Sequence, residues 1–298
     1  MPKLKQILQR LYNKYNHRSF IGSDPLQFVS HYSRRADMEI AALLASCLAY
    51  GRVGQIENSL NDLLGRIEKS PLEFVKNFDS RKRARLKTFR HRFNSGDDIS
   101  DLLAILKIVF AQYGSIETFF AAGYEATDKN VAPGLANFSK ALMGIYAQKF
   151  GKKAGRGLKY LLPDAANLSV CKRLNLFLRW MVRNDNVDAG LWKSVSKSKL
   201  IVPVDTHMGR LCRVLGLYQR KTMSLAAAVE ITENFAKIAP DDPVKYDFAL
   251  SRIGIRQNCT GSHSRACADC ELIRYCKKSG RKYGDRIPEK NTKTFKRP

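Results

Sequence analysis

The stretch Val202-Pro203-Val204-Asp205-Thr206-His207 organises the rest of this sequence. A short apolar run is interrupted by Pro203, and an amphipathic segment with apolar residues at 208, 211, 212 and 215 follows Asp205. Asp205 therefore lies where a helix N-cap is expected, because an aspartate there accepts hydrogen bonds from the first free backbone N–H groups. The positive end of the helix dipole also favours its ionised form. The simplest interpretation of Asp205 is a capping residue with no further role.

Apolar residues recur at helical spacing along most of the chain. No sustained strand alternation occurs between residues 38 and 200. The pattern predicts an all-α fold with helices over the segments 3–15, 38–50, 53–67, 101–113, 116–124, 135–150 and 173–183.

The 298 residues carry 52 Lys plus Arg against 27 Asp plus Glu, a formal net charge of +25. A field of this sign attracts polyanions, nucleic acid above all. No apolar run reaches the roughly 18 residues that a membrane-spanning helix needs. We therefore expect a cytoplasmic protein, associated with the nucleoid, that binds duplex DNA and has no membrane partner.

Residues 81–92, RKRARLKTFRHR, hold seven Lys or Arg in twelve positions. Leu86, Phe89 and Phe93 keep an apolar stripe at helical spacing, so we predict a packed helix with a basic outer face. That face either contacts phosphates or is only solvated.

Lys172 begins a second basic segment, in which Lys172, Asn175, Arg179 and Arg183 share one helical face. A cation is unfavourable at the positive end of a helix dipole, so we expect a larger share of neutral amine at Lys172. A neutral amine is what a nucleophilic lysine requires. The alternative is a lysine that contacts phosphate or solvent.

Four of the seven cysteines lie within 18 residues, as Cys259-x7-Cys267-x2-Cys270-x5-Cys276. Four thiolates suit tetrahedral zinc or an iron–sulfur cluster. Structural zinc usually joins two CxxC pairs across a longer gap, so the compact array favours a [4Fe-4S] cluster, with zinc as the alternative.

These features occur together in one known family: the sequence resembles the helix-hairpin-helix DNA glycosylases of the endonuclease III type. The resemblance covers most of residues 36–276 and rests on Ile40–Cys47, on Lys172, on Val202–His207 and on the cysteine array. Within that superfamily the chain is most similar to a little-characterised bacterial branch, a domain of unknown function that carries the run from Lys172 to Arg183.

The resemblance implies a two-lobed, all-α glycosylase-like fold with a C-terminal four-cysteine metal loop. Residues 1–36 and 206–276 would form one helical lobe with the iron–sulfur loop, residues 37–205 a barrel-like helical lobe, and residues 277–298 a basic flexible tail. A flipped nucleotide would occupy the cleft, with Lys172 and Asp205 at its mouth.

The sequence departs from this family at four places. The hairpin expected before Lys172 should be rich in glycine, but residues 161–171 contain none. Extra length between Lys172 and Asp205 falls in residues 184–198, where we expect it to rebuild the pocket. Cys47 stands where relatives often have a DNA-probing glutamine, and the first gap of the cysteine array is one residue longer than usual.

The function that these features predict is base-excision DNA repair by a monomeric DNA glycosylase with AP lyase activity. Asp205 would stabilise positive charge on the sugar, and Lys172 would attack C1′. The cluster would do no redox chemistry and would hold its loop against phosphates. Tyr50 and Arg52 are candidates for filling the gap in the duplex. The expected DNA contacts are Tyr50, Arg52, Arg81, Arg85, Arg92, Arg173, Arg179, Arg265 and Lys277.

Two other functions remain open on the sequence. The missing glycines favour a non-catalytic DNA- or RNA-binding protein that retains the fold. The basic tail, together with zinc in place of the cluster, favours a zinc-stabilised RNA-binding module.

The metal assignment can be tested directly. Because thiolate-bound iron–sulfur clusters absorb visible light, anaerobically purified protein should be brown, with broad absorbance near ~400 nm. A colourless protein with stoichiometric zinc by elemental analysis would contradict the cluster.

Overall fold

Helix α2 (Arg35–Cys47) is the centre of the core in this computed structural model, which describes residues 2–167, 169–256, 259 and 265–276. Every residue from Glu39 to Cys47 is buried, as its apolar run requires. Helix α2 packs most extensively against the 3-10 segment η2 (Pro25–His31) and helix α10 (Lys172–Val182).

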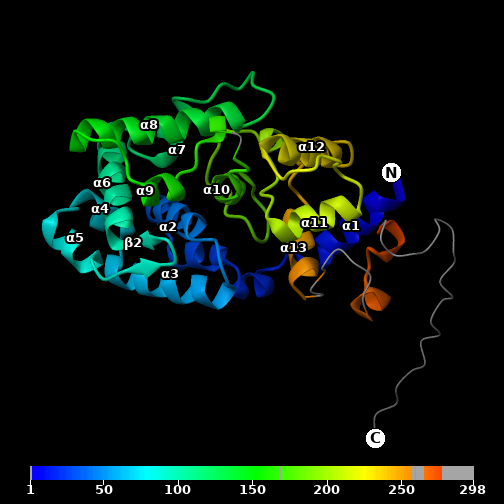
Figure 1. The fold of residues 1–298 in the computed structure, drawn as a ribbon. Helices are drawn as coiled ribbons and strands as arrows, with labels where there is room; N and C mark the ends of the chain where they lie inside the picture. Colours follow the sequence, from blue (N-terminus) through cyan, green and yellow to red (C-terminus); the bar gives the residue numbers. More distant parts are fainter. Residues whose placement is uncertain (1, 168, 257–258, 260–264, 277–298) are drawn as a thin grey trace, which may run out of the picture.

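The other helices form two groups on either side of α10 (Figure 1). The first group contains α3 (Val53–Ile67), α4 (Pro71–Lys76), α5 (Ser80–Leu86), α6 (Gly96–Tyr113), α7 (Ile116–Ala121), α8 (Ala132–Phe150) and α9 (Arg156–Leu161). The second contains α1 (Pro2–Tyr15), α11 (Thr206–Val214), α12 (Leu225–Ala236) and α13 (Asp247–Arg256). Short 3-10 segments complete the described chain: η1 (Arg18–Ser23), η3 (Ala165–Asn167), η4 (Lys197–Lys199), η5 (Arg265–Asp269) and η6 (Ile273–Tyr275).

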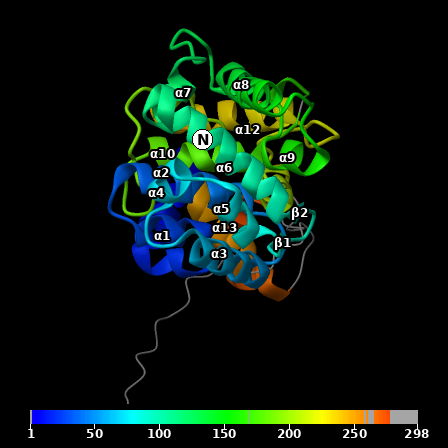
Figure 2. The same ribbon diagram turned by 90° about the vertical axis from the view of Figure 1, so that its left-hand side faces the viewer.

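The described chain is thus mostly helical, which confirms the all-α prediction. Its regular strands, over the described ranges, are β1 (Arg90–His91) and β2 (Asn94–Ser95). They pair as a small antiparallel hairpin, which lies beside α9 at the edge of the first helix group (Figure 2).

The helix predicted over residues 81–92 was wrong beyond Leu86, where α5 ends. Ser95 and Asp98 form a capping box that begins α6 three residues after Phe93, so the chain must turn back before it. The predicted apolar stripe is therefore broken. Leu86 and Phe89 are buried, whereas 67% of Phe93 is exposed at the tip of the hairpin.

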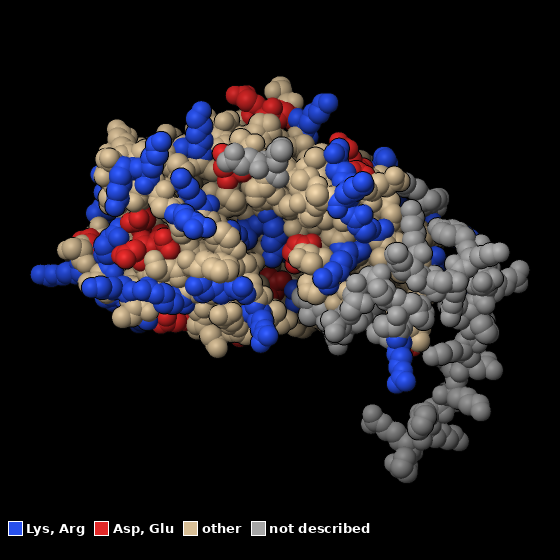
Figure 3. All heavy atoms as spheres, in the orientation of Figure 1, with Lys and Arg blue, Asp and Glu red and all other residues tan. Residues whose placement is uncertain are grey.

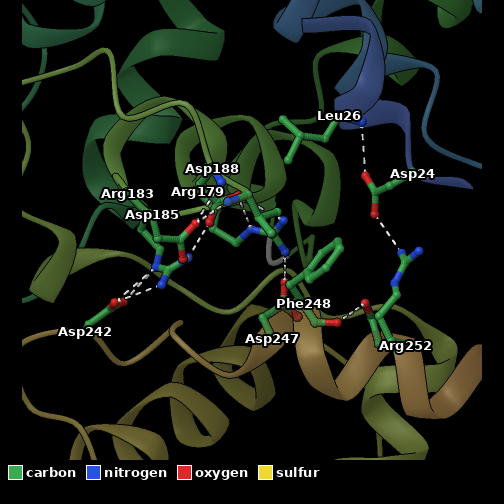
Figure 4. A network of polar contacts seen from close by, with 12 residues as sticks. Asp24, Leu26, Arg179, Arg183, Asp185, Asp188, Asp242, Asp247, Phe248 and Arg252 are labelled. Carbon is green, nitrogen blue, oxygen red and sulfur yellow. Dashed lines mark hydrogen bonds and ion pairs between the residues drawn. The ribbon is translucent and has the colours of Figure 1, made fainter. Parts of the chain in front are cut away.

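Beyond Lys172, the polar face predicted on α10 is buried. Arg179 and Arg183 are buried, and carboxylates from three other segments surround their guanidinium groups (Figure 4). Arg179 pairs with Asp188 and with Asp247 at the start of α13. Helical spacing identified a common face, but it could not tell whether water or aspartates cover that face.

Arg183 contacts three carboxylates, one more than Arg179. Its guanidinium pairs with Asp188, lies 2.9 Å from Asp185 and donates three hydrogen bonds of 3.0–3.1 Å to Asp242. Tyr12 of α1 donates to the same Asp185 at 3.0 Å. The network thereby joins α10 to the second helix group.

The segment 184–198 does not rebuild a pocket at Lys172, contrary to the sequence-based expectation. Its backbone N–H groups at Ala189, Gly190 and Trp192 donate to the carbonyls of Trp180 and Met181, at the other end of α10. Asp185 and Asp188 within it supply the carboxylates of the arginine network.

Within the described part of the chain, no helix combines the length and the apolar character needed to cross a bilayer.

Glycine at position 96 permits the close contact between α5 and the start of α6. A Cβ there would lie 1.7 Å from the carbonyl oxygen of Leu86, so Gly96→Ala requires the backbone to move. We expect it to lower the free energy of unfolding by at least about 2 kcal/mol, as overpacking does. Gly65→Ala is the matched control: a Cβ on this exposed α3 position meets nothing within 4 Å. It should stabilise the helix by about 0.5–1 kcal/mol in the same urea titration.

Candidate active site

Asp205 is the N-cap of α11, as its sequence predicted. Its Oδ1 accepts a hydrogen bond from the backbone N–H of Met208 at 2.8 Å. The residues before it, from Leu200 to Val204, are buried, and the N–H of Val202 donates to Thr232 Oγ1 at 3.0 Å. The carboxylate is therefore fixed on both sides, by a buried segment and by a helix start. The second carboxylate oxygen of Asp205, Oδ2, faces a residue of another helix.

That residue is Lys172, the first residue of α10. Its Nζ lies 3.9 Å from Asp205 Oδ2 and donates to the carbonyl of Ala49 at 3.2 Å. Side-chain exposures of 29% for Lys172 and 43% for Asp205 leave both groups open to a ligand. The fold thus brings an amine and a carboxylate from two distant helix starts to one place.

The turn before Lys172 is made without glycine. Cys171, the residue that precedes α10, adopts φ 47° and ψ 35°, the left-handed conformation that glycine adopts most easily. Its side chain is buried, and Sγ lies 3.7 Å from the carbonyl oxygen of Pro163. The strained backbone of Cys171 therefore performs the turn for which the sequence shows no glycine.

Arg173 and Tyr50, both predicted to contact DNA, are held by contacts within the protein. The guanidinium of Arg173 lies 5.0 Å from the ring centroid of Tyr50 and 4.3 Å from that of Tyr160, and it donates to the carbonyls of Cys47 and Tyr160. The Tyr50 hydroxyl donates to the backbone of His91 at 3.0 Å and lies 2.7 Å from Asn94 Oδ1. Burial, assisted by Tyr160, raises the pKa of Tyr50 to about 12, so the hydroxyl remains a donor at neutral pH.

Phe93 is the residue that sequence reasoning missed. Its exposed ring is parallel to that of Tyr50 (interplanar angle 3°, centroids 6.3 Å apart) and perpendicular to Tyr160. The guanidinium of Arg92 lies 5.3 Å from its centroid. Tyr160 itself is 39% exposed. The signal that could have revealed Phe93 was the Ser95–Asp98 capping box, which places Phe93 in a turn.

The remaining predicted DNA contacts fall into three classes. Arg52, Arg81, Arg92 and Arg265 are exposed, as a phosphate contact requires. Arg85 pairs with Glu68 and lies over the Phe74 ring, and Arg179 is buried; the assignment of Arg179 to the DNA surface was wrong because two aspartates hold it inside. Lys277 lies outside the described residues.

Lysine and arginine side chains spread over both helix groups on the face that contains α10 and α11 (Figure 3). A hollow between the groups carries basic and acidic atoms side by side. A separate groove of 770 Å³ lies between α3 and α4, with Leu64 and Phe74 among its lining residues. Glu68 and Glu73 on its rim already pair with Arg85 and Arg34, so we do not place the site there.

Comparison with known proteins identifies the family of this chain. A family model described as "Protein of unknown function (DUF2400)" matches residues 24–256. The chain belongs to this family. No curated protein and no solved structure matches it.

In this DUF2400 protein the cysteine array lies beside the second helix group. Cys259, Cys267, Cys270 and Cys276 are all partly exposed. Burial raises the pKa of the Cys270 thiol. Among the described residues, no three His, Cys, Asp or Glu side chains are arranged as a metal site. The donor set fits a thiolate-bound metal by its chemistry, while residues 260–264 of the loop lie outside the described ranges.

The capping role of Asp205 predicts a specific pattern of stability in the DUF2400 protein. Asn caps a helix about as well as Asp, so Asp205→Asn should leave the free energy of unfolding nearly unchanged, whereas Asp205→Ala should lower it by about 1 kcal/mol. Urea unfolding of the three proteins measures both. An equal loss in the two variants would mean that the carboxylate charge, rather than the cap, stabilises the fold.

Proposed function

We propose that this protein is a base-excision DNA glycosylase with AP lyase activity that acts on duplex DNA, in a two-lobed helix-hairpin-helix fold. The observation that carries the proposal is the 3.9 Å approach of Lys172 Nζ to Asp205 Oδ2, with both side chains accessible. An amine beside a carboxylate at an open site suits attack on a sugar carbon that becomes positively charged.

The target nucleotide must leave the base stack, because its C1′ is otherwise inaccessible. The bond between C1′ and the base then breaks, and its electron pair leaves with the base. Asp205 stabilises the positive charge that develops on the sugar, as a preorganised carboxylate does. The base takes up a proton from water or from a neighbouring acid.

Lys172, as a neutral amine, then forms a bond from Nζ to C1′ and loses one proton. The bond between C1′ and the ring oxygen O4′ breaks, O4′ takes up a proton, and the iminium (protonated Schiff base) forms between Nζ and C1′. Asp205 is the nearest carboxylate to receive a proton from this amine. A base then removes the proton at C2′, a double bond forms between C2′ and C3′, and the phosphate leaves from C3′ with the electron pair of its C–O bond. The strand is thereby cleaved by β-elimination without an external oxidant.

The four cysteines, Cys259, Cys267, Cys270 and Cys276, would hold a [4Fe-4S] cluster, with zinc as the alternative. A cluster there would supply a rigid support, not electron transfer. It would present the exposed Arg265 and Arg274 to phosphates.

The proposal is tested by covalent trapping. Borohydride should link the protein to a duplex that carries an abasic site or a suitable lesion, and Lys172→Gln should abolish trapping while duplex binding persists. Asp205→Asn removes a charge but keeps the cap, so base release should fall by ~10²–10³ in rate. Base release at the wild-type rate in Asp205→Asn would refute the catalytic carboxylate. Trapping that persists in Lys172→Gln would place the nucleophile elsewhere.

Phe93 is the side chain best placed to fill the gap left by the flipped nucleotide. Tyr50 is held by hydrogen bonds, whereas Phe93 is 67% exposed with Arg92 beside it. We expect Phe93→Ala to weaken binding to a lesion duplex by about 1–3 kcal/mol, the value of one base–aromatic stack. Fluorescence of 2-aminopurine opposite the lesion should then respond less to the protein. Tyr113→Ala is the matched control, because Tyr113 is an exposed ring on α6 that packs on Phe119. Equal effects of the two variants would exclude a specific role for Phe93.

A non-catalytic nucleic-acid-binding protein remains the second candidate. The glycine-free turn at Cys171 favours it, because the catalytic family that the sequence resembles has a glycine-rich hairpin at this place. Such a protein should bind the same duplexes with a strong salt dependence and should give no trapped product.

A further inference from the structure

The contact between Lys172 and Asp205 is too weak to fix their geometry. The two side chains are 29% and 43% exposed, and their nitrogen and oxygen lie 3.9 Å apart. Ion pairs of this kind contribute little and are screened by salt. Their relative position must therefore be set by the helices that carry them.

Those helices are tied together by Arg179, seven residues after Lys172 on the same side of α10. Two turns of a helix bring a residue back to the same face, about 10 Å further along. Arg179 is 2% exposed and pairs with Asp247, the first residue of α13 (Figure 4). Helix α13 packs against α11, whose N-cap is Asp205. Lys172 is therefore connected to Asp205 through rigid elements: helix α10, the ion pair of Arg179 with Asp247, and the packed helices α13 and α11.

Asp247 is not required to neutralise Arg179. The guanidinium already lies 3.2 Å from a carboxylate oxygen of Asp188. Asp247 is itself 5% exposed, and its carboxylate is a second, fully buried charge on the same cation. Burial raises the pKa of Asp247, the Arg179 pair opposes that rise, and the charges of Asp205 and Lys172 also act on it. The carboxylate thus lies within electrostatic range of both residues of the proposed catalytic pair.

We propose that Asp247 is a positioning residue: through its buried ion pair with Arg179 it fixes the start of α10 against the α11–α13 pair, and so sets the distance and the charge balance between Lys172 and Asp205. The inference rests on the proposed function for its catalytic consequence. Its geometric content does not depend on which nucleic acid is bound.

The test compares Asp247→Asn with Asp242→Asn. Both replace one carboxylate of the same network by an amide of equal shape, but Asp242 binds Arg183, further along the chain from Lys172. The first readout needs no DNA: the rate at which formaldehyde and cyanoborohydride methylate Lys172, measured by peptide mass spectrometry. The second is borohydride trapping on an abasic-site duplex, with duplex affinity and thermal midpoint measured alongside.

In Asp247→Asn we expect Lys172 to be methylated about threefold faster or more, because the start of α10 is no longer held against α11 and Nζ is less closely held by Asp205. Trapping should slow by about tenfold to a hundredfold, the effect of a small misplacement of reacting groups, while duplex affinity stays the same. Asp242→Asn should leave methylation and trapping within about twofold of wild type, whatever it does to the thermal midpoint.

A double variant separates positioning from folding. Arg179→Met with Asp247→Leu replaces the ion pair by apolar side chains, which commonly preserves stability. It should recover the thermal midpoint without recovering trapping, and it supplies folded protein if Asp247→Asn does not fold. Recovery of wild-type trapping and methylation in the double variant, or equal effects of Asp247→Asn and Asp242→Asn, would overturn the proposal. Failure of the wild-type protein to trap any duplex would instead refute the proposed lyase activity, and the methylation rates would still decide the role of Asp247.

Discussion

The buried ion pairs of Arg179 and Arg183 are the constraint on which the arrangement of the two helix groups depends. Both guanidinium groups leave water completely, at a cost of several kcal/mol each that only well-placed carboxylates offset. Removing one partner of such a pair typically costs about 3–5 kcal/mol, since the other charge is left buried and alone. Asp188 and Asp185 come from the segment after α10, Asp242 and Asp247 from the approach to α13. The network can therefore form only when α10 and the second helix group are correctly docked, which makes it a determinant of geometry more than of net stability.

The candidate site lies where this docking brings two helix starts together. Lys172 and Asp205 each occupy the first or the capping position of a helix, so their backbone atoms are fixed while their side chains stay accessible. Cys171 makes the turn before Lys172 at the cost of a left-handed backbone in a residue other than glycine. Strain of this kind persists only where the surroundings determine the conformation, and here they include a buried side chain and a helix held at its far end by Arg179.

The charge of the protein is distributed less simply than its total of +25 suggests. Three arginines of the α10 region bind carbonyls and carboxylates inside the protein. They are Arg173, Arg179 and Arg183. Arg52, in the loop after α2, and Arg92, in the hairpin of β1 and β2, remain exposed. Aromatic rings accompany them, since Phe93 and Tyr160 are both exposed and in mutual contact. Exposed rings among cations suit unstacked bases and phosphates better than they suit a smooth anionic surface.

The sequence by itself determined the helical class, the N-cap at Asp205 and the helix that begins at Lys172, because helical periodicity and capping are local and can be read over a few residues. It also identified Lys172 and Asp205 as the candidate catalytic residues. Only the tertiary structure decided that they lie 3.9 Å apart, that the polar face of α10 is inside, and that Phe93 rather than Tyr50 is the free aromatic ring. The same physical reason applies to all three. The helical period of 3.6 residues shows which side chains share a face, but the residues that pack against that face come from distant segments of the chain. Asp188 and Asp247 could turn Arg179 from a surface cation into a buried one without changing a single residue of its own helix.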